Sequence, residues 1–308
     1  MSFTNQRAAY GQALVDLGKV NPNIVVLDAD LGSSTMGRMF EDAYPDRHFE
    51  MGIAEANMIG VSAGLALTGK IPFANSFAVF ASGRVYDQIR QSVCIGKVNV
   101  KAVGSSAGLS DFGDGATHQT IEDIAIMRAL PNMTVISPAD AYEAYQAAIA
   151  CAKHDGPVYL RLNRNDYPNV TKQDKPFVIG EPEVLSDGND VAIIATGYMV
   201  NLALEAAEAL KGKMSAKVIN LATIKPLDLG KIAKAIGDCK AIVTVEEHNI
   251  IGGMGSAVAE VMRLNPKPID FIGINDVYGR SAGSYTELLE YYGLTSEKIA
   301  ETVLRMSK

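Results

Sequence analysis

Short apolar runs rich in Val and Ile alternate along the chain with longer segments of helical periodicity. Apolar runs of about four to eight residues, bounded by turn residues, are typical of buried strands. The runs form two sets, one in each half of the chain. They predict strands at Ile24–Asp28, Ile71–Ala74, Val100–Val103, Thr134–Ser137 and Val158–Leu162, and then at Val191–Thr196, Lys217–Asn220, Ala241–Val245 and Ile269–Ile274.

The segments between these runs carry apolar residues at helical spacing. Ala141–Lys153 and Asn201–Lys211 each place their apolar side chains on one helical face, and we expect Asn201 to be the N-cap of the second helix. A third helical segment, Ala54–Leu67, is almost entirely apolar. Alternating strands and helices predict the α/β class, with mostly parallel sheets that carry helices on both faces.

One segment, from Asn165 to Asp187, breaks this alternation. It contains three prolines, a polar run and little periodicity, which is typical of a linker. A chain of 308 residues is long enough for two domains with separate cores. We therefore expect a domain of residues 1–165, a linker of residues 166–186 and a second domain of residues 187–308.

Composition narrows the class of protein. Apolar residues make up 48% of the chain, and the net charge of −7 argues against a nucleic-acid partner, because phosphate contacts need clustered Lys and Arg. The apolar runs are too short to span a membrane, and the N-terminus shows no secretory signal. The three cysteines have no metal-ligand spacing, which indicates buried thiols in a reducing cytoplasm.

Candidate chemistry is expected where parallel strands end, because ligands gather at that edge of a sheet. Four such segments contain Gly, Asp, His or Ser: Asp28–Ser34, Met51–Met58, Phe77–Gln88 and Ser105–Gln119.

Glu55 stands out because it begins an otherwise apolar helical segment. A carboxylate in such a setting is costly unless it has a partner or a proton. The alternative is a solvent-exposed Glu in the first turn, which the helix dipole favours. Residue types alone favour this second interpretation.

An ordered series of motifs resembles the transketolases and the 1-deoxyxylulose-5-phosphate synthases. The series comprises Gly52–Met58, Pro72–Phe80, Tyr86–Arg90, Gly113–Gln119, Ile136–Asp140, Leu162–Arg164, Ile224–Asp228, and Val245–His248 followed by Gly252-Gly253. It spans nearly the whole chain, and its order is more specific than any single motif. The resemblance implies the C-terminal half of a transketolase made as a separate subunit, with a pyrimidine-binding domain followed by a transketolase C-terminal domain.

The resemblance also implies a site for thiamine diphosphate. The glutamate that matches Glu55 is catalytic: it hydrogen-bonds N1′ of the aminopyrimidine and favours the imino tautomer that deprotonates the thiazolium. Phe77 and Phe80, which residue types alone place in the core, would line the aminopyrimidine pocket, with Phe80 stacking on the ring. Asp30 and Gln88 match further cofactor-proximal positions. A further aromatic of some transketolases is replaced here by Ser82-Gly83.

The Gly113–Gln119 segment is expected to face the substrate. Its Gly-Asp-Gly triplet is similar to the one that holds magnesium diphosphate, but residues 137–145 lack the asparagine that should follow. The resemblance instead assigns Asp114 to a donor-sugar hydroxyl and His118 to the reacting carbonyl, where an imidazole can donate and assist proton transfer. The alternative for His118 is a cap of a helix that starts at Thr120. An upstream histidine of some relatives is replaced near Ser106.

Arg7, Ser34 and Arg164 match positions that bind the terminal phosphate of the sugar. Two guanidiniums and a hydroxyl suit a phosphate dianion, although each residue alone would be read as a surface or ion-pair residue. The resemblance gives the C-terminal domain a role in packing and subunit association, and we expect no catalytic residue there.

A complete transketolase also needs a domain that holds the diphosphate through Mg²⁺. We expect a separate N-terminal subunit to supply it, in an α2β2 assembly that transfers a two-carbon ketol unit from a ketose phosphate to an aldose phosphate. Three alternatives stay open: the β subunit of a 2-oxo acid dehydrogenase E1, a deoxyxylulose phosphate synthase-like enzyme, and a regulatory or scaffolding subunit without catalysis.

Overall fold

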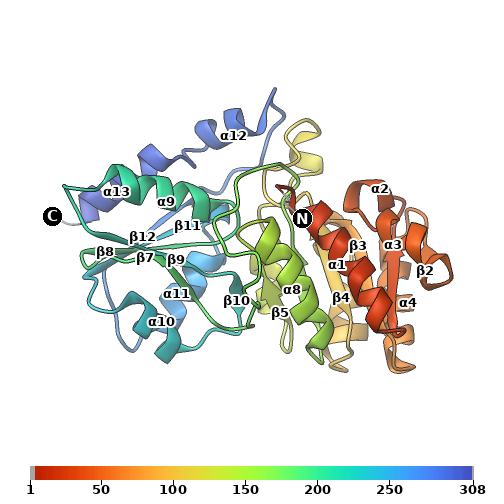
Figure 1. The fold of residues 1–308 in the computed structure, drawn as a ribbon. Helices are drawn as coiled ribbons and strands as arrows, with labels where there is room; N and C mark the ends of the chain where they lie inside the picture. Colours follow the sequence, from red (N-terminus) through yellow and green to blue (C-terminus); the bar gives the residue numbers. More distant parts are fainter. Residues whose placement is uncertain (1–3, 307–308) are drawn as a thin grey trace.

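The computed structural model describes residues 4–306, which form two α/β units side by side (Figure 1). The first unit contains a seven-stranded sheet in the order β10-β5-β6-β4-β3-β1-β2. Its strands are β1 (Ile24–Asp28), β2 (His48–Glu50), β3 (Ile71–Phe77), β4 (Lys101–Ser105), β5 (Thr134–Ile136), β6 (Val158–Arg161) and β10 (Thr223–Lys225). All neighbours are parallel except β10 and β5.

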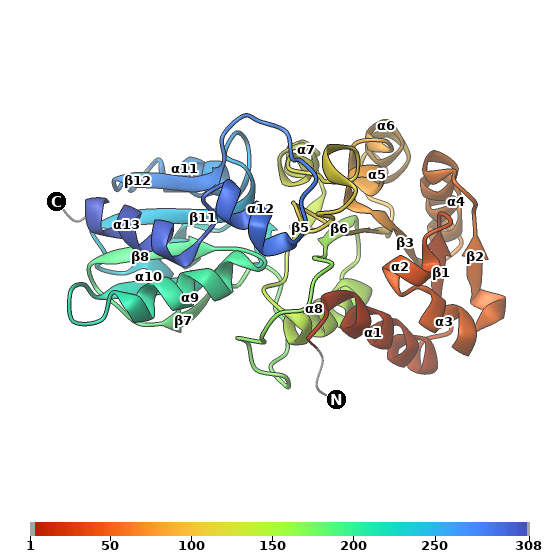
Figure 2. The ribbon, with the colours of Figure 1, turned by 90° about the horizontal axis from the view of Figure 1, so that it is seen from above.

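The second unit contains a five-stranded sheet in the order β12-β11-β8-β9-β7, in which only β7 and β9 run antiparallel. Its strands are β7 (Glu183–Ser186), β8 (Val191–Ala195), β9 (Ala216–Asn220), β11 (Ala241–Asn249) and β12 (Ile269–Ile274). Figure 2 shows the chain's C-terminus at the outer end of this unit. The α/β class with two mostly parallel sheets is thus confirmed.

Helices cover both faces of both sheets (Figure 2). The first unit has α1 (Gln6–Val20), α2 (Gly32–Thr35), α3 (Arg38–Ala43), α4 (Glu55–Leu67), α5 (Ala78–Ser82), α6 (Tyr86–Gln88), α7 (Asp123–Ala129) and α8 (Ala141–Lys153), the 3₁₀ turns η1 (Pro45–Arg47) and η3 (Gly115–Thr117), and the π-helical turn η2 (Ile89–Cys94). The second has α9 (Met199–Ala209), α10 (Leu229–Ile236), α11 (Met254–Met262), α12 (Tyr285–Tyr291) and α13 (Ser296–Met306).

The hydrophobic cores explain why the two units hold together. One cluster joins Tyr10 and Leu14 of α1 to Ala148 of α8 and to the first sheet. A second cluster contains both Met58 of α4 and Met254 of α11, so it extends from one unit to the other. The two sheets therefore share part of their buried apolar surface, which is the main stabilising contribution to such packing.

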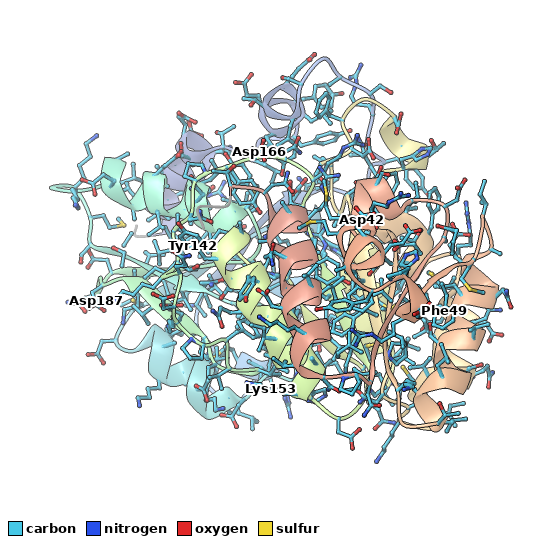
Figure 3. All side chains as sticks on the ribbon, turned by 45° about the vertical axis from the view of Figure 1, so that its right-hand side comes forward. Asp42, Phe49, Tyr142, Lys153, Asp166 and Asp187 are labelled. Atoms are coloured by element: carbon cyan, nitrogen blue, oxygen red, sulfur yellow. The ribbon has the colours of Figure 1, made fainter. Side chains whose placement is uncertain are left out.

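The apolar pattern predicts the edge strand β12 but misses the other three edge strands of the described residues, β2, β7 and β10. β2, β7 and β10 are each short, and each has a single neighbour. Short edge strands need no continuous apolar run; Phe49 of β2, for example, is exposed and lies at the outer rim of the first unit (Figure 3). The N-cap prediction was wrong, because α9 begins at Met199 and Asn201 is buried inside it.

A buried carboxyl group bridges the two units. Glu143 of α8 accepts hydrogen bonds from the Ala139 amide at 2.6 Å and from the Asn220 Nδ2 of β9 at 2.9 and 3.0 Å. Burial raises the pKa of Glu143 from 4.5 to about 7. Its hydrogen-bond donors act against this shift but do not cancel it.

Glu143 should make the chain less stable as pH rises from 4.5 to about 7. Its folded pKa lies above the unfolded value, so its contribution is complete below the unfolded pKa and is lost as pH rises through the folded pKa. Glu143→Gln removes this titration, and the unpaired Oδ1 of Asn220 can accept from the new amide. In urea titrations, we expect the free energy of unfolding of the wild type to fall relative to that of Glu143→Gln as pH rises through that window, by on the order of 2 kcal/mol. A pH-independent difference would contradict this assignment.

Candidate active site

The candidate site lies where the parallel strands of the first sheet end. β6, β4, β3 and β1 are consecutive neighbours, so their carboxyl ends share one edge. Phe77 is the last residue of β3, and the segments that follow β6, β4 and β1 carry Arg164, the 106–119 loop and Ser34, respectively. Residues that are far apart in sequence therefore converge, as the parallel topology requires.

Glu55 is the first residue of α4, and its side chain is only 3% exposed. Its Oε1 lies 2.7 Å from Nη1 of Arg84, whose side chain is about half exposed. This arrangement excludes the solvent-exposed first-turn glutamate considered from the sequence. The carboxylate is buried and charge-paired, which offsets much of the cost of removing it from water.

An aromatic cluster adjoins this ion pair. The Arg84 guanidinium lies 4.0 Å from the centroid of the Phe80 ring. The Phe80 and Phe77 rings are nearly parallel, with centroids 6.3 Å apart. His118 presents its ring edge-on to both, at 5.4 Å from Phe80 and 6.3 Å from Phe77. We call Glu55, Arg84, Phe77, Phe80 and His118 the central cluster.

Arg84 is the member of the central cluster that the sequence analysis missed. The signals were a carboxylate in an apolar segment, which requires a cation when buried, and an Arg four positions after Phe80, in the turn that follows α5. Nothing in the sequence pairs Glu55 with a residue 29 positions away.

His118 follows the 3₁₀ turn η3, with its Nδ1 3.0 Å from Oγ1 of Thr117. The alternative of a helix cap is wrong, because the next helix starts at Asp123 and not at Thr120. Asp114, directly before η3, is exposed. The loop therefore carries an imidazole that contacts the aromatic rings and a carboxylate that is open to solvent.

Asp111 is a second residue that the sequence analysis did not single out. Its buried carboxylate forms an ion pair with Nη1 of Arg164 at 2.7 Å. Burial raises the pKa of Asp111, and Asp114 raises it further, while Arg164 and His118 act in the opposite direction. These electrostatic contacts place Asp111 between Arg164 and the Asp114–His118 turn.

The structure also brings together the three expected phosphate-binding residues. Arg7 Nη1 donates to the Ser34 carbonyl at 2.7 Å, and its Nη2 donates to the Arg164 carbonyl at 3.0 Å. Burial and the Arg164 charge lower the pKa of Arg7, so the two guanidiniums are close enough to repel one another. An anion placed between them would relieve that repulsion.

Asp30 and Gln88 are placed differently from each other. Asp30 follows β1 with a φ of 58°, and its amide donates to Oε1 of Glu50 at 2.8 Å. The same oxygen accepts from the Gly52 amide at 2.9 Å, which ties the Asp30 turn to the segment before Glu55. Gln88 ends α6, and no contact with the central cluster is described for it.

Several polar atoms at this edge lack a partner. Asn75 Nδ2, Ser76 Oγ and Ser106 Oγ are buried, and none has a hydrogen bond within the described residues. Asn75 and Ser76 lie near the end of β3, and Ser106 follows β4 with a φ of 54°. Buried polar groups rarely stay unpaired, so this edge fits a polar ligand.

Residues 4–170 match the family "transketolase, pyrimidine binding domain", and residues 180–299 match "transketolase, C-terminal domain". The chain belongs to the transketolase family.

Individual relatives match over nearly their whole length. The chain is 50% identical to a protein of Methanocaldococcus jannaschii described as a transketolase C-terminal section, over 99% of this chain and 97% of the relative. It is 42% identical to a 6-deoxy-6-sulfo-D-fructose transketolase subunit of a Clostridium species, over 95% and 91% of the two chains. A solved split-gene transketolase, described as an inactive β4 tetramer, superposes with a TM-score of 0.90 at 46% identity and covers 99% of both chains.

The family membership confirms the resemblance of the ordered motifs and implies dependence on thiamine diphosphate. In the described part of this transketolase chain, no group of three or more His, Cys, Asp or Glu residues is arranged to hold a metal ion. Nor does any helix among residues 4–306 combine the length and apolar character needed to cross a membrane.

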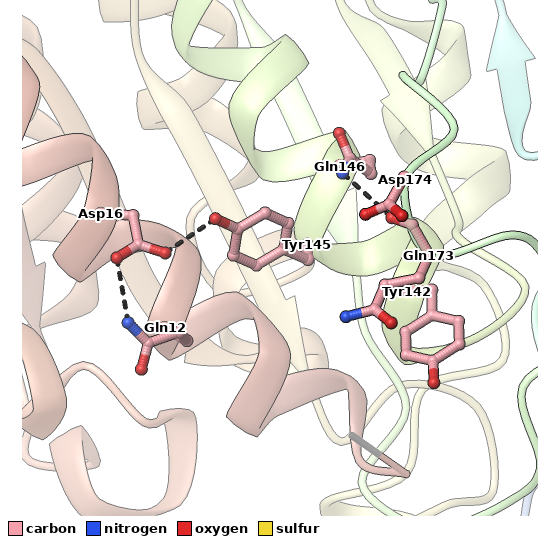
Figure 4. Close-up of a pocket in the computed structure, with 7 residues that line it drawn as sticks. All are labelled: Gln12, Asp16, Tyr142, Tyr145, Gln146, Gln173 and Asp174. Carbon is pink, nitrogen blue, oxygen red and sulfur yellow. Dashed lines mark hydrogen bonds between the residues drawn. The ribbon is translucent and has the colours of Figure 1, made fainter. Parts of the chain in front are cut away.

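A separate cavity of about 240 Å³ lies on the α1–α8 face of this transketolase chain (Figure 4). It shares no residue with the central cluster. Its polar groups largely bond to each other: Asp16 accepts from Tyr145 Oη at 2.7 Å and from Gln12 Nε2 at 3.1 Å. We therefore place the candidate active site at the strand ends and not in this cavity.

Proposed function

We propose that this chain is the C-terminal subunit of a two-subunit transketolase, in which Glu55 activates thiamine diphosphate for transfer of a two-carbon ketol unit between sugar phosphates. The observation that carries the proposal is the central cluster. It combines a buried carboxylate, two nearly parallel aromatic rings and an imidazole at one edge of the sheet.

The central cluster fits the aminopyrimidine half of the cofactor. Glu55 would form a hydrogen bond with the ring nitrogen N1′ and exchange a proton with it, and Phe80 and Phe77 offer apolar faces for stacking. We assign Asp30 and Gln88 to the rim of the same pocket. When bound, thiamine diphosphate supplies the nucleophilic carbon that carries the ketol unit. The residues of this chain would orient the cofactor, and Glu55 would keep a carboxyl group beside the ring nitrogen N1′.

The remaining residues are assigned to the sugar. Asp114 would bond a donor hydroxyl, and His118 would donate to the reacting carbonyl oxygen and assist proton transfer. Arg7, Ser34 and Arg164 would hold the anionic end, since two neighbouring guanidiniums favour a dianion. The Clostridium relative is named for a sulfonated sugar, and this arrangement suits either a phosphate or a sulfonate.

A partner subunit with the diphosphate-binding domain and Mg²⁺ completes the proposal. The outer face of α4 supports it: Ile53, next to this helix, and Leu67 are 77% and 78% exposed, and a Cβ at Gly60 or Gly64 would meet no atom within 4 Å. An uncharged apolar face beside Glu55 is typical of an interface. The split-gene relative, whose β4 form is described as inactive, supports an α2β2 assembly as the active form. Three buried cysteines without a disulfide suit a reducing cytoplasm.

Substrate preference separates the proposal from its rivals. The chain is mixed with the N-terminal transketolase subunit, Mg²⁺ and thiamine diphosphate, and then assayed with xylulose 5-phosphate, 6-deoxy-6-sulfofructose or pyruvate as donor and an aldose phosphate as acceptor. We expect ketol transfer from at least one of the two ketoses and no turnover of pyruvate. Turnover of pyruvate alone would instead indicate a 2-oxo acid dehydrogenase or deoxyxylulose phosphate synthase. If addition of this chain leaves the partner's activity unchanged, a catalytic role is excluded.

A further inference from the structure

The loop that carries Asp114 and His118 is held in part by residues of the C-terminal domain. We call residues 106–119 the substrate loop. Its Phe112 carbonyl accepts from the Ala282 amide at 2.9 Å, and Gln119 Nε2 donates to the Arg280 carbonyl at 3.0 Å. The substrate loop is therefore clamped by a segment more than half the chain away in sequence.

Glu247 of β11 makes the most buried of these contacts. Its side chain is 4% exposed, and its Oε1 accepts from the Leu109 amide at 2.6 Å. At Gly108, which has a φ of 66°, an added Cβ would lie 2.5 Å from the Glu247 carboxyl carbon. The backbone of the substrate loop is thus pressed directly against this carboxylate, and only glycine fits there.

The same carboxylate reaches the segment that carries Arg164. Glu247 Oε2 accepts from Tyr285 Oη at 2.7 Å and, more weakly, from Asn163 Nδ2 at 3.4 Å. Tyr285 Oη in turn accepts from Asn163 Nδ2 at 2.9 Å, and Asn163 directly precedes Arg164. Glu247 therefore joins two segments that approach the candidate site from different strands.

A role in stability alone does not account for this choice of partners. The neighbouring Glu246 accepts from the Met254 and Gly255 amides at 2.6 and 2.8 Å and so caps α11. Glu143 also bridges the two units, but through α8 and β9. Of these three buried carboxyl groups, Glu247 is the one that bonds to the substrate loop.

We propose that Glu247 is a positioning residue of the active site: it does not touch the substrate, but it fixes the substrate loop and the Arg164 segment relative to each other. The inference rests on the proposed function, because that function gives Asp114, His118 and Arg164 their roles. It assigns to the C-terminal domain a part in catalysis beyond packing and subunit association. A displacement of about 1 Å at a catalytic group can lower a rate by about 10²-fold, so such positioning has a measurable effect.

The first test needs no activity. Amide hydrogen exchange is measured on the full chain for wild type, Glu247→Ala, and the matched control Glu143→Ala. We expect exchange in residues 107–119 to become about tenfold faster in Glu247→Ala and to stay at the wild-type rate in Glu143→Ala. Equal exchange of the substrate loop in both variants would overturn the proposal. Should Glu247→Ala not fold, Gly108→Ala is used, because its Cβ displaces the loop while the carboxylate remains; wild-type exchange in that variant would equally overturn it.

The second test uses the reconstituted enzyme. Glu247→Ala should lower kcat/KM for the donor by at least about tenfold and leave the affinity for thiamine diphosphate unchanged, because Glu55, Phe77 and Phe80 lie outside the substrate loop. Glu247→Gln should restore most of the activity, since its amide oxygen can still accept from Leu109. A loss of the same size in Glu143→Ala, each variant assayed equally far below its melting temperature, would show that Glu247 acts through stability alone. If the proposed function is wrong, the reconstituted wild-type enzyme will show no ketol transfer. If only the role of Glu247 is wrong, the wild type will be active, and Glu247→Ala will match Glu143→Ala in activity and in exchange of the substrate loop.

Discussion

Replacing Glu55 with Gln is expected to lower kcat of the reconstituted enzyme by about 10²- to 10⁴-fold, the range typical of a lost acid–base group. Gln has nearly the shape of Glu but cannot exchange a proton with the cofactor. The side chain is 3% exposed, so water cannot easily take its place. The measurement is steady-state turnover with saturating ketose donor and thiamine diphosphate, together with circular dichroism to show that the variant is folded.

The control for this variant is Arg84→Met. Glu55→Gln also removes the charge pair with Arg84, which joins Nη1 and Oε1 at 2.7 Å. Arg84→Met removes the same ion pair but keeps the carboxyl group, and should cause a distinctly smaller loss of kcat. Equal losses in the two variants would mean that the ion pair, and not proton exchange at Glu55, is what turnover requires. Wild-type turnover by Glu55→Gln would contradict the assignment outright.

Replacing His118 with Ala should lower kcat/KM for the ketose donor by about 10²- to 10³-fold, the usual cost of removing one donor to a developing oxyanion. The imidazole contacts Phe80 and Phe77 edge-on and lies in the loop that also presents Asp114. Its loss should leave the affinity for thiamine diphosphate nearly unchanged. Cofactor titration, followed by steady-state kinetics with varied donor, measures both quantities.

Thr117→Val serves as the matched control for His118→Ala. This change removes the hydroxyl 3.0 Å from Nδ1 of His118 but keeps the imidazole. We expect a small loss, because a single exposed hydrogen bond contributes only about 1 kcal/mol. If Thr117→Val lost as much activity as His118→Ala, the orientation of the loop and not the imidazole would be the important factor. Unchanged donor kinetics in His118→Ala would remove this residue from the site.

Much of the fold could be predicted because its central strands are buried on both faces. β1 and the edge strand β12 have the predicted bounds, and the central strands other than β1 differ by a few residues at their ends. β2, β7 and β10 escaped prediction because each is a short edge strand of three or four residues, which is identified by its neighbour and not by a long apolar run. β10 is the clearest case: it belongs to the second half of the chain but completes the sheet of the first.

The candidate site was predictable only in part, for a related reason. Glu55, Phe80 and His118 were singled out by ordered motifs, and the structure brings them together. Arg84 was missed because its partner lies 29 residues away, and Glu247 because the amide that it binds lies 138 residues away. Such pairs depend on tertiary contacts, and local periodicity carries no information about them.

Cofactor-dependent complementation tests the central claim most directly. Thiamine diphosphate-dependent ketol transfer is measured while this chain is titrated into a fixed amount of the N-terminal transketolase subunit with Mg²⁺. We expect that neither chain alone turns over, and that activity rises with added chain until the two are present in equal amounts. We also expect that Glu55→Gln at the same ratio fails to restore turnover. Full activity of either chain alone, or no cofactor-dependent transfer at any ratio, would contradict this claim.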